Sequence, residues 1–276
     1  MKTDPTQNGK FLPLMEDFYT IQGEGFHTGK AAYFLRVGGC DVGCYWCDVK
    51  ESWNPKLHPL TDTDEIVSRV TDNPAATVVI TGGEPLMYKL DYLCAKLREK
   101  GLQIHLETSG SHPLSGSFDW ICLSPKKKSP PKQEIYSRAN ELKVIVFDET
   151  DFEWAEENAK FVSSDCYLCL QPECSRMQVV MPGIIEFVKS NPRWHISLQA
   201  HKFMHIPYNQ FPFSFQIFNY SVYWMNIFMH NIFISGSYLL TLYFNYLSSK
   251  FPSHEKIVFF NFLGYFWIQF FPFRAI

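Results

Sequence analysis

The stretch Arg36–Asp48 reads RVGGCDVGCYWCD, and its cysteines Cys40, Cys44 and Cys47 have the spacing C-x3-C-x2-C. A structural zinc site closes with four protein ligands, and a 4Fe–4S cluster usually takes four thiolates. No fourth Cys or His stands at a suitable distance in the sequence. Three thiolates therefore predict a 4Fe–4S cluster with one iron left open to a small molecule. On spacing alone, three unrelated thiols in a buried loop are the alternative.

Strand-length apolar runs alternate with helical segments on both sides of this stretch. The expected strands are residues 31–37, 77–81, 102–107, 118–123, 141–147, 166–170 and 194–198. The expected helices are residues 61–70, 86–100, 151–162 and 181–190. Such alternation predicts an α/β fold with a parallel sheet. In a barrel or half-barrel, the polar loops that follow the strands gather on one face, and the cysteines lie in one of these loops.

A second motif, Gly82-Gly83-Glu84-Pro85, follows the expected strand 77–81 and begins 35 residues after Cys47. Glycine lacks a Cβ, so the backbone of such a loop can approach a ligand closely. Alone, the motif is typical of an ordinary turn. Together with the three cysteines it resembles the radical S-adenosylmethionine enzymes, in which the open iron binds the cofactor and one electron cleaves its sulfonium group.

Composition narrows the class of protein further. The chain has 276 residues, of which 46% are hydrophobic and 19% charged, and a formal net charge of −3. This near-neutral balance predicts no direct nucleic-acid partner. Residues 1–10 are polar and carry no apolar core of a secretory signal. The eight cysteines therefore read as intracellular thiols, and we expect a cytoplasmic protein.

Several further segments resemble one radical S-adenosylmethionine family, the 7-carboxy-7-deazaguanine synthases, over residues 11–207. The segments that carry this resemblance are Ile21-Gln22-Gly23-Glu24-Gly25, Arg36, Cys47-Asp48, Thr81-Gly82-Gly83-Glu84-Pro85, Glu107-Thr108-Ser109-Gly110, Ser124-Pro125-Lys126, Gln171-Pro172 and Gln199-Ala200-His201-Lys202. The resemblance implies an incomplete TIM-type (β/α) barrel of about six parallel strands. It also implies a homodimer.

The resemblance further implies a carbon–nitrogen lyase. The family converts 6-carboxy-5,6,7,8-tetrahydropterin into 7-carboxy-7-deazaguanine with loss of ammonia, a step in queuosine (7-deazapurine) biosynthesis that provides a tRNA modification precursor. Its cofactors are a 4Fe–4S cluster, S-adenosylmethionine and Mg²⁺. Its partners would be the small pterin substrate and a flavodoxin-like or other one-electron donor.

The resemblance also assigns site residues by position. Cys40, Cys44 and Cys47 resemble the cluster ligands. The substrate-binding positions would be Ile21, Gln22, Gly23, Arg36, Thr81 and Pro207. The cofactor-binding positions would be Gly83, Ser124, Pro125, Lys126, Gln171, Pro172, Glu173 and Cys174. No further catalytic residue is expected, because the cofactor carries the difficult chemistry.

One departure from the family pattern concerns Mg²⁺. The family commonly has Thr or Ser directly after the Cys-Asp pair, and that hydroxyl resembles a Mg²⁺ ligand. Here the position is Val49, whose side chain offers no oxygen to a hard cation. Asp48 is then the candidate ligand, directly or through water, unless the substrate carboxylate holds the ion.

A second departure is the C-terminal region. We expect a catalytic domain over residues 1–207 and a hydrophobic, aromatic-rich extension over residues 208–276, in which residues 203–249 contain no Lys, Arg, Asp or Glu. A membrane anchor is one interpretation, since the run is long enough to span a bilayer. Scattered Asn, Ser, Gln and His favour the other, a poorly ordered product of stop-codon loss or a frame shift, so no membrane partner is expected.

Two alternative functions stay open at the level of sequence. A radical activase, which makes a glycyl radical on a partner protein, shares the cysteines and a GGEP-like segment but lacks the Gln22–Glu24 loop at this spacing. A non-catalytic family member is favoured by Val49 and by the chain that continues past Pro207. Binding of a pterin would exclude the first, and turnover would exclude the second.

Overall fold

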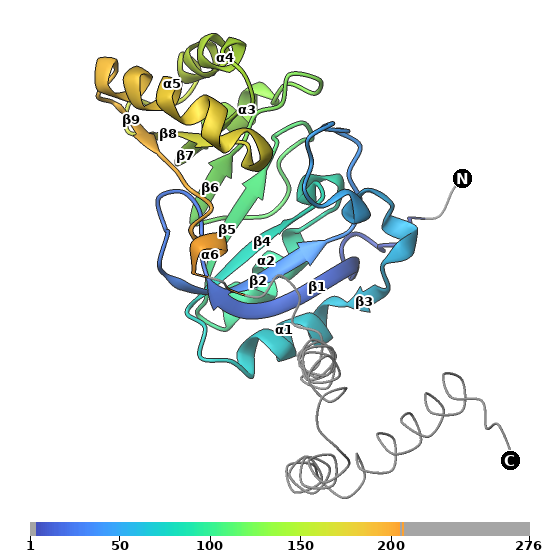
Figure 1. The fold of residues 1–276 in the computed structure, drawn as a ribbon. Coiled ribbons are helices and arrows are strands. Elements are labelled where there is room, and N and C mark those ends of the chain that lie inside the picture. The colour runs from blue at the N-terminus through green and yellow to red at the C-terminus, as the bar shows by residue number, and fades with distance from the viewer. Residues whose placement is uncertain (1–3, 205, 207–276) are drawn as a thin grey trace, which may run out of the picture. The chain divides into compact units, whose positions relative to one another are not determined.

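The computed structural model describes residues 4–204 and 206. They form one twisted, open sheet of nine strands in the order β3-β1-β2-β4-β5-β6-β7-β8-β9 (Figure 1). Every neighbouring pair from β2 to β9 is parallel, whereas β1 pairs antiparallel with both β2 and β3. The sheet curves but does not close, so the expected incomplete TIM-type barrel is confirmed.

The strands and helices alternate along the chain. The strands are β1 (Phe11–Ile21), β2 (Ala31–Val37), β3 (Leu60–Asp62), β4 (Thr77–Gly82), β5 (Gln103–Thr108), β6 (Trp120–Leu123), β7 (Glu141–Val146), β8 (Tyr167–Pro172) and β9 (Trp194–Ile196). The α-helices are α1 (Thr63–Thr71), α2 (Asp91–Glu99), α3 (Gln133–Tyr136), α4 (Thr150–Ala159), α5 (Met177–Ser190) and α6 (Ala200–Phe203). Short 3₁₀ turns are η1 (Lys50–Trp53), η2 (Pro55–Leu57), η3 (Pro85–Met87) and η4 (Cys174–Arg176).

The elements differ from the sequence expectation in a few places. Within the described residues seven strands belong to the parallel set, against about six expected, and the first of them is preceded by the antiparallel β1. The expected helix 86–100 begins only at Asp91, because Pro85 starts the separate turn η3. The expected helix 181–190 begins earlier, at Met177. Pro182 therefore lies inside the helix.

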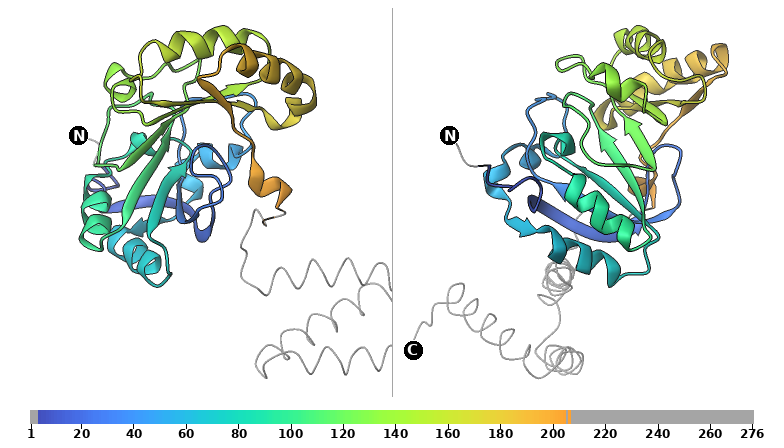
Figure 2. Two further views of the ribbon diagram at one scale, coloured as in Figure 1. Left: turned by 90° about the vertical axis from the view of Figure 1, so that its left-hand side faces the viewer. Right: turned by 180° about the vertical axis from the view of Figure 1, so that it is seen from behind.

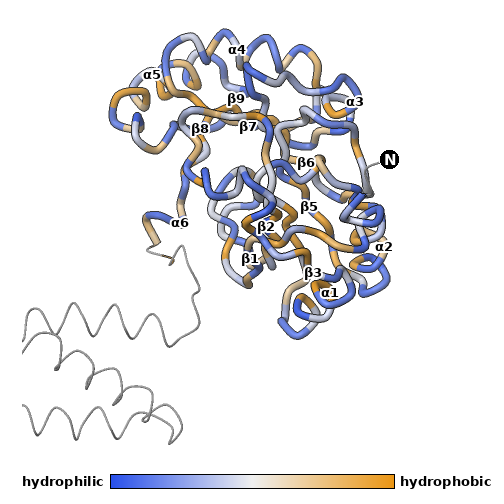
Figure 3. Tube along the Cα trace, turned by 90° about the vertical axis from the view of Figure 1, so that its right-hand side faces the viewer, coloured by the Kyte–Doolittle hydropathy of each residue, from blue (hydrophilic) through white to orange (hydrophobic). Residues whose placement is uncertain are grey.

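The two faces of the sheet have different chemistry. Residues that alternate along each strand point outward and pack against the helices in one apolar core, which includes Leu35, Ile80, Leu106, Val144 and Leu170. Figure 2 shows the helices α1 to α5 on this outer side. In Figure 3 the strands are largely hydrophobic, whereas much of the helix surface is hydrophilic. The core therefore lies between sheet and helices, and the inner face is left for a site.

The helices covering the sheet are short and amphipathic. None of the helices in residues 4–204 is long and apolar enough to cross a membrane. Pro207 and the predicted extension, residues 208–276, lie outside the described residues, so the expectations made for them stay predictions.

Candidate active site

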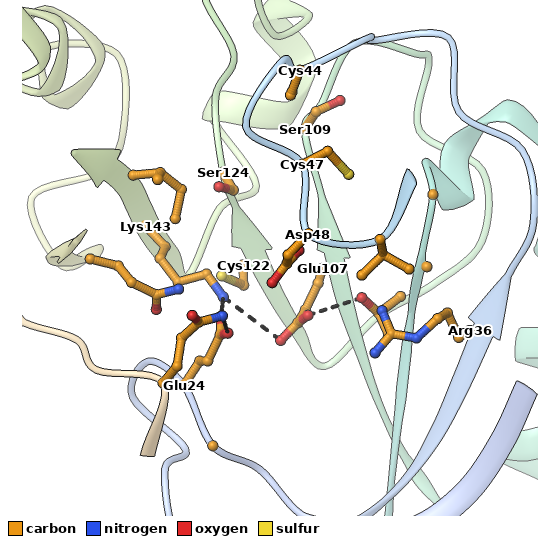
Figure 4. A pocket seen from close by; sticks show the side chains of 18 of the residues that line it. Glu24, Arg36, Cys44, Cys47, Asp48, Glu107, Ser109, Cys122, Ser124 and Lys143 are labelled. Atoms are coloured by element: carbon orange, nitrogen blue, oxygen red, sulfur yellow. Dashed lines mark hydrogen bonds and ion pairs between the residues drawn. The ribbon is translucent and has the colours of Figure 1, made fainter. Parts of the chain in front are cut away.

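A cavity of about 300 Å³ opens on the inner face of the sheet, at the carboxyl ends of the parallel strands. This is where parallel α/β folds place their ligands. The cavity gathers residues from segments far apart in the sequence, among them the cysteine loop, Gly83, Ser124 and Gln171. Figure 4 shows the side chains from different strands pointing into it.

The predicted cluster ligands lie in the loop that follows β2. Cys40, Cys44 and Cys47 are half-buried, carry no disulfide and line the cavity. Two glycines shape the loop, because Gly39 has φ +104° and Gly43 has φ +66°, in the region that glycine tolerates best. The loop is fixed by backbone bonds at one end, since the amide of Cys40 donates to Trp53 O over 3.2 Å.

The chemistry of these three cysteines fits a multi-iron cluster better than a single ion. Among the described residues, no three Cys, His, Asp or Glu side chains converge closely enough to chelate one metal ion. A 4Fe–4S cluster instead holds each thiolate on a different iron atom, so three sulfurs around one cavity suit it. Burial raises the pKa of Cys40 and Cys44, and a bound metal would keep both as thiolates.

The Gly82–Pro85 motif packs directly onto the cysteine loop. A Cβ at Gly83 would lie 2.1 Å from Gly39 O, so only glycine lets these two backbones meet. Glu84 is buried, and its carboxylate accepts hydrogen bonds from Thr108 Oγ1 at 2.6 Å and from the amide of Ser109 at 2.8 Å. The motif is therefore braced against the end of β5, which the sequence alone did not indicate.

The predicted cofactor-binding residues after β6 come close to the cysteine loop at the edge of the cavity. Ser124 and Lys126 line it, and Lys126 Nζ donates to Ser124 Oγ over 2.6 Å and lies 5.6 Å from the centroid of the Trp46 ring. Pro125 is buried and lines a smaller neighbouring cavity instead. The end of β8 and the residues after it complete this wall with four more predicted cofactor-binding residues, Gln171, Pro172, Glu173 and Cys174.

The predicted substrate-binding residues form the remaining wall. Gln22 Nε2 donates to Glu107 Oε1 over 2.9 Å, and Thr81 Oγ1 donates to Glu107 Oε2 over 3.0 Å. Arg36 is held by Glu16, which accepts from Nε over 2.7 Å. The terminal guanidinium nitrogens of Arg36 make no hydrogen bond within the described residues. Ile21 and Gly23 line the same wall.

A charged centre that the sequence analysis did not assign lies in the middle of the site. Lys143, on β7, has a side chain only 7% exposed, and its Nζ lies 2.6 Å from Glu24 Oε2 and 4.0 Å from Glu107 Oε1. Glu24 also accepts from Gln199 Nε2 over 2.8 Å. Figure 4 shows the lysine reaching between the two carboxylates.

The charge of this centre follows from its contacts. Burial alone would raise the pKa of Glu24, but the adjacent Lys143 ammonium and the hydrogen bonds to it outweigh burial and lower the pKa to about 2. Burial alone would lower the pKa of Lys143, but the negative charges of Glu24 and Glu107 raise it well above its usual value. The lysine and Glu24 are therefore both ionised at neutral pH.

A signal for this centre was present in the sequence. Glu107 and Lys143 are charged residues within strands, and alternation places them on the face opposite to the core residues Leu106 and Val144. The register then brings the inner residues of neighbouring strands together, as in the pair Lys143 and Cys169 of β7 and β8. Only the register shows that these charges share one cavity with Glu24.

The closing loop, residues 22–30, covers the opposite ends of the strands. Its Phe26 ring stacks on Trp120 with centroids 4.9 Å apart, and its His27 ring lies 4.5 Å from His105. The amide of Phe26 donates to Glu141 Oε2 over 3.3 Å. The loop therefore covers the half-barrel at the amino ends of β5, β6 and β7. Its residues Gln22 and Glu24 line the cavity.

Comparison with known proteins agrees with this geometry. The sequence model of the Radical SAM superfamily matches residues 35–121. A 7-carboxy-7-deazaguanine synthase of Flavobacterium psychrophilum is 54% identical over 201 residues, which cover 73% of this chain and 95% of the relative. The synthase of Escherichia coli K12 is 31% identical over 221 residues, covering 70% of this chain and 98% of the relative.

The fold comparison gives the same result. The crystal structure of QueE from Escherichia coli superposes with a TM-score of 0.62 at 30% sequence identity, and covers 70% of this chain and 96% of that one. The three cysteines and Gly82–Pro85 lie within the range that the superfamily model matches. The chain therefore belongs to the 7-carboxy-7-deazaguanine synthase family of radical S-adenosylmethionine enzymes.

Proposed function

We propose that this protein makes 7-carboxy-7-deazaguanine from 6-carboxy-5,6,7,8-tetrahydropterin with release of ammonia, as a carbon–nitrogen lyase in queuosine biosynthesis. The observation that carries this assignment is the 54% identity to a 7-carboxy-7-deazaguanine synthase over 95% of that relative. The cavity has groups suited to each part of such a substrate. The cofactors of the protein are the 4Fe–4S cluster and the S-adenosylmethionine of the radical S-adenosylmethionine superfamily.

The cysteine loop would hold the cluster through Cys40, Cys44 and Cys47. When bound, the cluster and S-adenosylmethionine supply the one-electron chemistry that begins the reaction. The chain itself positions the reactants and excludes water. The backbone of Gly83, the Ser124–Lys126 loop and residues 171–174 surround the space next to the cysteines and would contact S-adenosylmethionine.

The substrate would lie against Arg36 and Glu107. The terminal nitrogens of Arg36 present a planar fork that matches a carboxylate. Glu107 is fixed by Gln22 and Thr81, and its carboxylate retains acceptor capacity for the ring N–H groups of a pterin. Ile21 and Gly23 would contact the ring, and we also propose Pro207, which lies outside the described residues, as a substrate contact.

We propose that Mg²⁺ is bound through Asp48 together with the substrate. Val49 lines the cavity without offering an oxygen, and Asp48 is a half-exposed carboxylate beside it. Mg²⁺ commonly keeps several waters and takes only one or two protein carboxylates plus substrate oxygens. The described residues contain no ready cluster of three metal-binding side chains, so substrate would have to complete the site.

The variant Val49→Thr tests this assignment of the ion. A hydroxyl beside Asp48 adds an oxygen ligand, so the Mg²⁺ concentration for half-maximal activation is expected to fall on the order of tenfold. The measurement is turnover against Mg²⁺ concentration, with Val49→Ala as the control that changes the size of the side chain without adding a ligand. An equal response in all three proteins would contradict the assignment.

We further propose a homodimer that works in the cytoplasm and receives single electrons from a flavodoxin-like donor. The eight cysteines, none of them in a disulfide, support a reducing compartment. The domain assignment is also proposed, with catalysis in residues 1–207 and no catalytic part for residues 208–276. Sedimentation velocity tests the dimer, and replacement of a chemical reductant by reduced flavodoxin tests the donor.

The deciding experiment is anaerobic turnover by the reconstituted full chain. Protein, S-adenosylmethionine, a reductant and the carboxytetrahydropterin are incubated with and without Mg²⁺, and the deazaguanine acid is measured by mass spectrometry. Formation of that acid together with ammonia is the expected result. Cleavage of S-adenosylmethionine to 5′-deoxyadenosine without the acid would reject the substrate but keep the enzyme class.

A further inference from the structure

The ion cluster of Lys143, Glu24 and Glu107 joins three separate parts of the fold. Lys143 lies on β7, Glu107 on β5 and Glu24 in the closing loop. All three line the cavity, and the lysine is the most deeply buried of them. Two like charges, Glu24 and Glu107, thus meet within reach of a single ammonium group.

Fold stability does not account for such a cluster. Removing charges from water costs several kcal/mol per ion, and well-packed apolar residues of the same volume often stabilise a fold as much or more. The neighbouring inward position on β7, Ile145, shows that this strand accommodates an apolar residue facing the cavity. A buried charge cluster that faces a ligand cavity points instead to a role in binding or reaction.

We propose that Lys143 is a positioning residue that holds Glu24 and Glu107 as a pair of carboxylates in the geometry that receives the substrate ring. Without the ammonium, two adjacent carboxylates repel each other and one takes up a proton. Protonation would turn one Glu107 oxygen into a donor and remove the negative charge, and displacement would move both oxygens, so Glu107 would accept less well from a ring N–H. This inference rests on the proposed function, because the ring that it concerns is that of the pterin.

Other charged and titratable groups surround the lysine and bear on its effect. Glu141, on the same strand, is buried, and burial raises its pKa. The groups that face Lys143 from the adjoining elements are Glu24, Glu107, Cys122, Lys126 and Cys169. Of these, only Glu24 and Glu107 lie within 4.0 Å of Nζ as ion-pair partners.

The test compares the full-length wild type with Lys143→Met, which keeps the length of the side chain and removes its charge. Binding of the carboxytetrahydropterin to the cluster-loaded, S-adenosylmethionine-bound protein is measured by anaerobic equilibrium dialysis. The dissociation constant is expected to rise on the order of 100-fold in the variant. The acid limb of kcat/KM is expected to move to higher pH by about one unit or more.

A second substitution separates positioning from a purely structural role. In Lys143→Met/Glu24→Gln the like-charged neighbour of Glu107 is also gone, so Glu107 can ionise again. The double variant is expected to bind substrate about tenfold more tightly than Lys143→Met alone. The double variant also removes the carboxylate of Glu24 that Lys143→Met alone would leave buried without its partner. If Lys143→Met does not fold, the double variant can therefore be compared directly with the wild type.

The control is Lys189→Met, which breaks the exposed ion pair with Glu186 on α5, and neither of these residues lines the cavity. It is expected to bind substrate as the wild type does. Unchanged pterin affinity in Lys143→Met, or no recovery in the double variant, would overturn the proposal for Lys143. Failure of the wild type itself to bind the pterin would instead overturn the proposed function, and the inference with it.

Discussion

Arg36 illustrates how a single residue serves both the sheet and the site. Its side chain is 19% exposed, and its ion pair with Glu16 uses only Nε. The sheet thus fixes the plane of the guanidinium while its two terminal nitrogens stay available at the cavity. Strand pairing places Arg36 opposite Thr81, which orients Glu107. Two groups that we propose to contact the substrate, Arg36 and Glu107, are therefore positioned through adjacent strands.

The variant Arg36→Lys tests this geometry. Lysine keeps the charge but loses the planar fork, so the KM for the carboxytetrahydropterin is expected to rise on the order of 30-fold. The measurement is steady-state turnover against pterin concentration. Cleavage of S-adenosylmethionine in the absence of pterin should stay at the wild-type rate. A lysine variant with wild-type KM would exclude bidentate binding of the substrate by Arg36.

At the scale of elements, the closing loop packs against strands at the open side of the half-barrel, where a complete barrel would have further strands. Gly25 has φ +66°, and a Cβ there would lie 2.0 Å from Glu141 Oε1. The amide of Gly25 also donates to Ser197 Oγ over 2.9 Å. The glycine thus allows the loop to press against β7 and the segment after β9, which brings Glu24 to Lys143.

The variant Gly25→Ala is expected to lower stability by about 2–4 kcal/mol, because the strain of positive φ adds to a clash with a buried carboxylate. Gly29→Ala is the matched control, since Gly29 has φ +88° but open space around a Cβ. It should lose only about 1 kcal/mol. Urea unfolding measures both, and equal losses would show that the contact with Glu141 is unimportant.

The closing loop also predicts how stability depends on pH. Burial lowers the pKa of both His27 and His105 to about 4, and for His27 the nearby His105 and Lys30 add to the effect. In the unfolded chain both histidines take up a proton near pH 6.5, whereas in the folded chain they do so only near pH 4. Between these two values the unfolded chain therefore binds more protons than the folded chain. Stability contributed by the pair is therefore lost as the pH falls through this window.

The loss is expected to be about 2 kcal/mol for each histidine, and thermal unfolding at a series of pH values measures it. The variant His27→Phe keeps an aromatic ring beside His105 but cannot take up a proton, so its stability should fall less steeply over the same range. Parallel curves for the variant and the wild type would show that His27 does not titrate as described.

At the scale of the whole molecule, nearly the full length of a relative is matched by less than three quarters of this chain. The Flavobacterium psychrophilum synthase is covered to 95% by 73% of this chain. The described residues that we propose to bind cofactor, substrate or Mg²⁺ lie within residues 21–174. The aromatic-rich residues 208–276 contribute to none of these assignments.

Truncation after Pro207 is therefore expected to increase the soluble yield and to leave turnover per cluster unchanged. The physical reason is the long uncharged, aromatic-rich sequence that the truncation removes, which favours aggregation. Yield in the soluble fraction and kcat/KM are the measurements. Lower activity of the truncated protein would show that the extension takes part in function, and would contradict the domain assignment.

From the sequence by itself we predicted the enzyme class, the three cysteine ligands and most of the residues that line the cavity. Local patterns sufficed for the cysteine loop, the glycine-rich motif and the strands, because these are properties of neighbouring residues, whereas the residues of the cavity wall were predicted through the resemblance to the family. Of the predicted site residues that the structure describes, Pro125 is the one that does not line the main cavity.

Only the tertiary structure decided what the central charges do. Lys143, Glu107 and Glu24 are far apart in the sequence, and their meeting depends on strand register and on the path of the closing loop. The same holds for Glu84, whose carboxylate braces Thr108 and Ser109 rather than facing a ligand. The ion pairs and hydrogen bonds of a site arise from distances across the fold, which no local sequence pattern encodes.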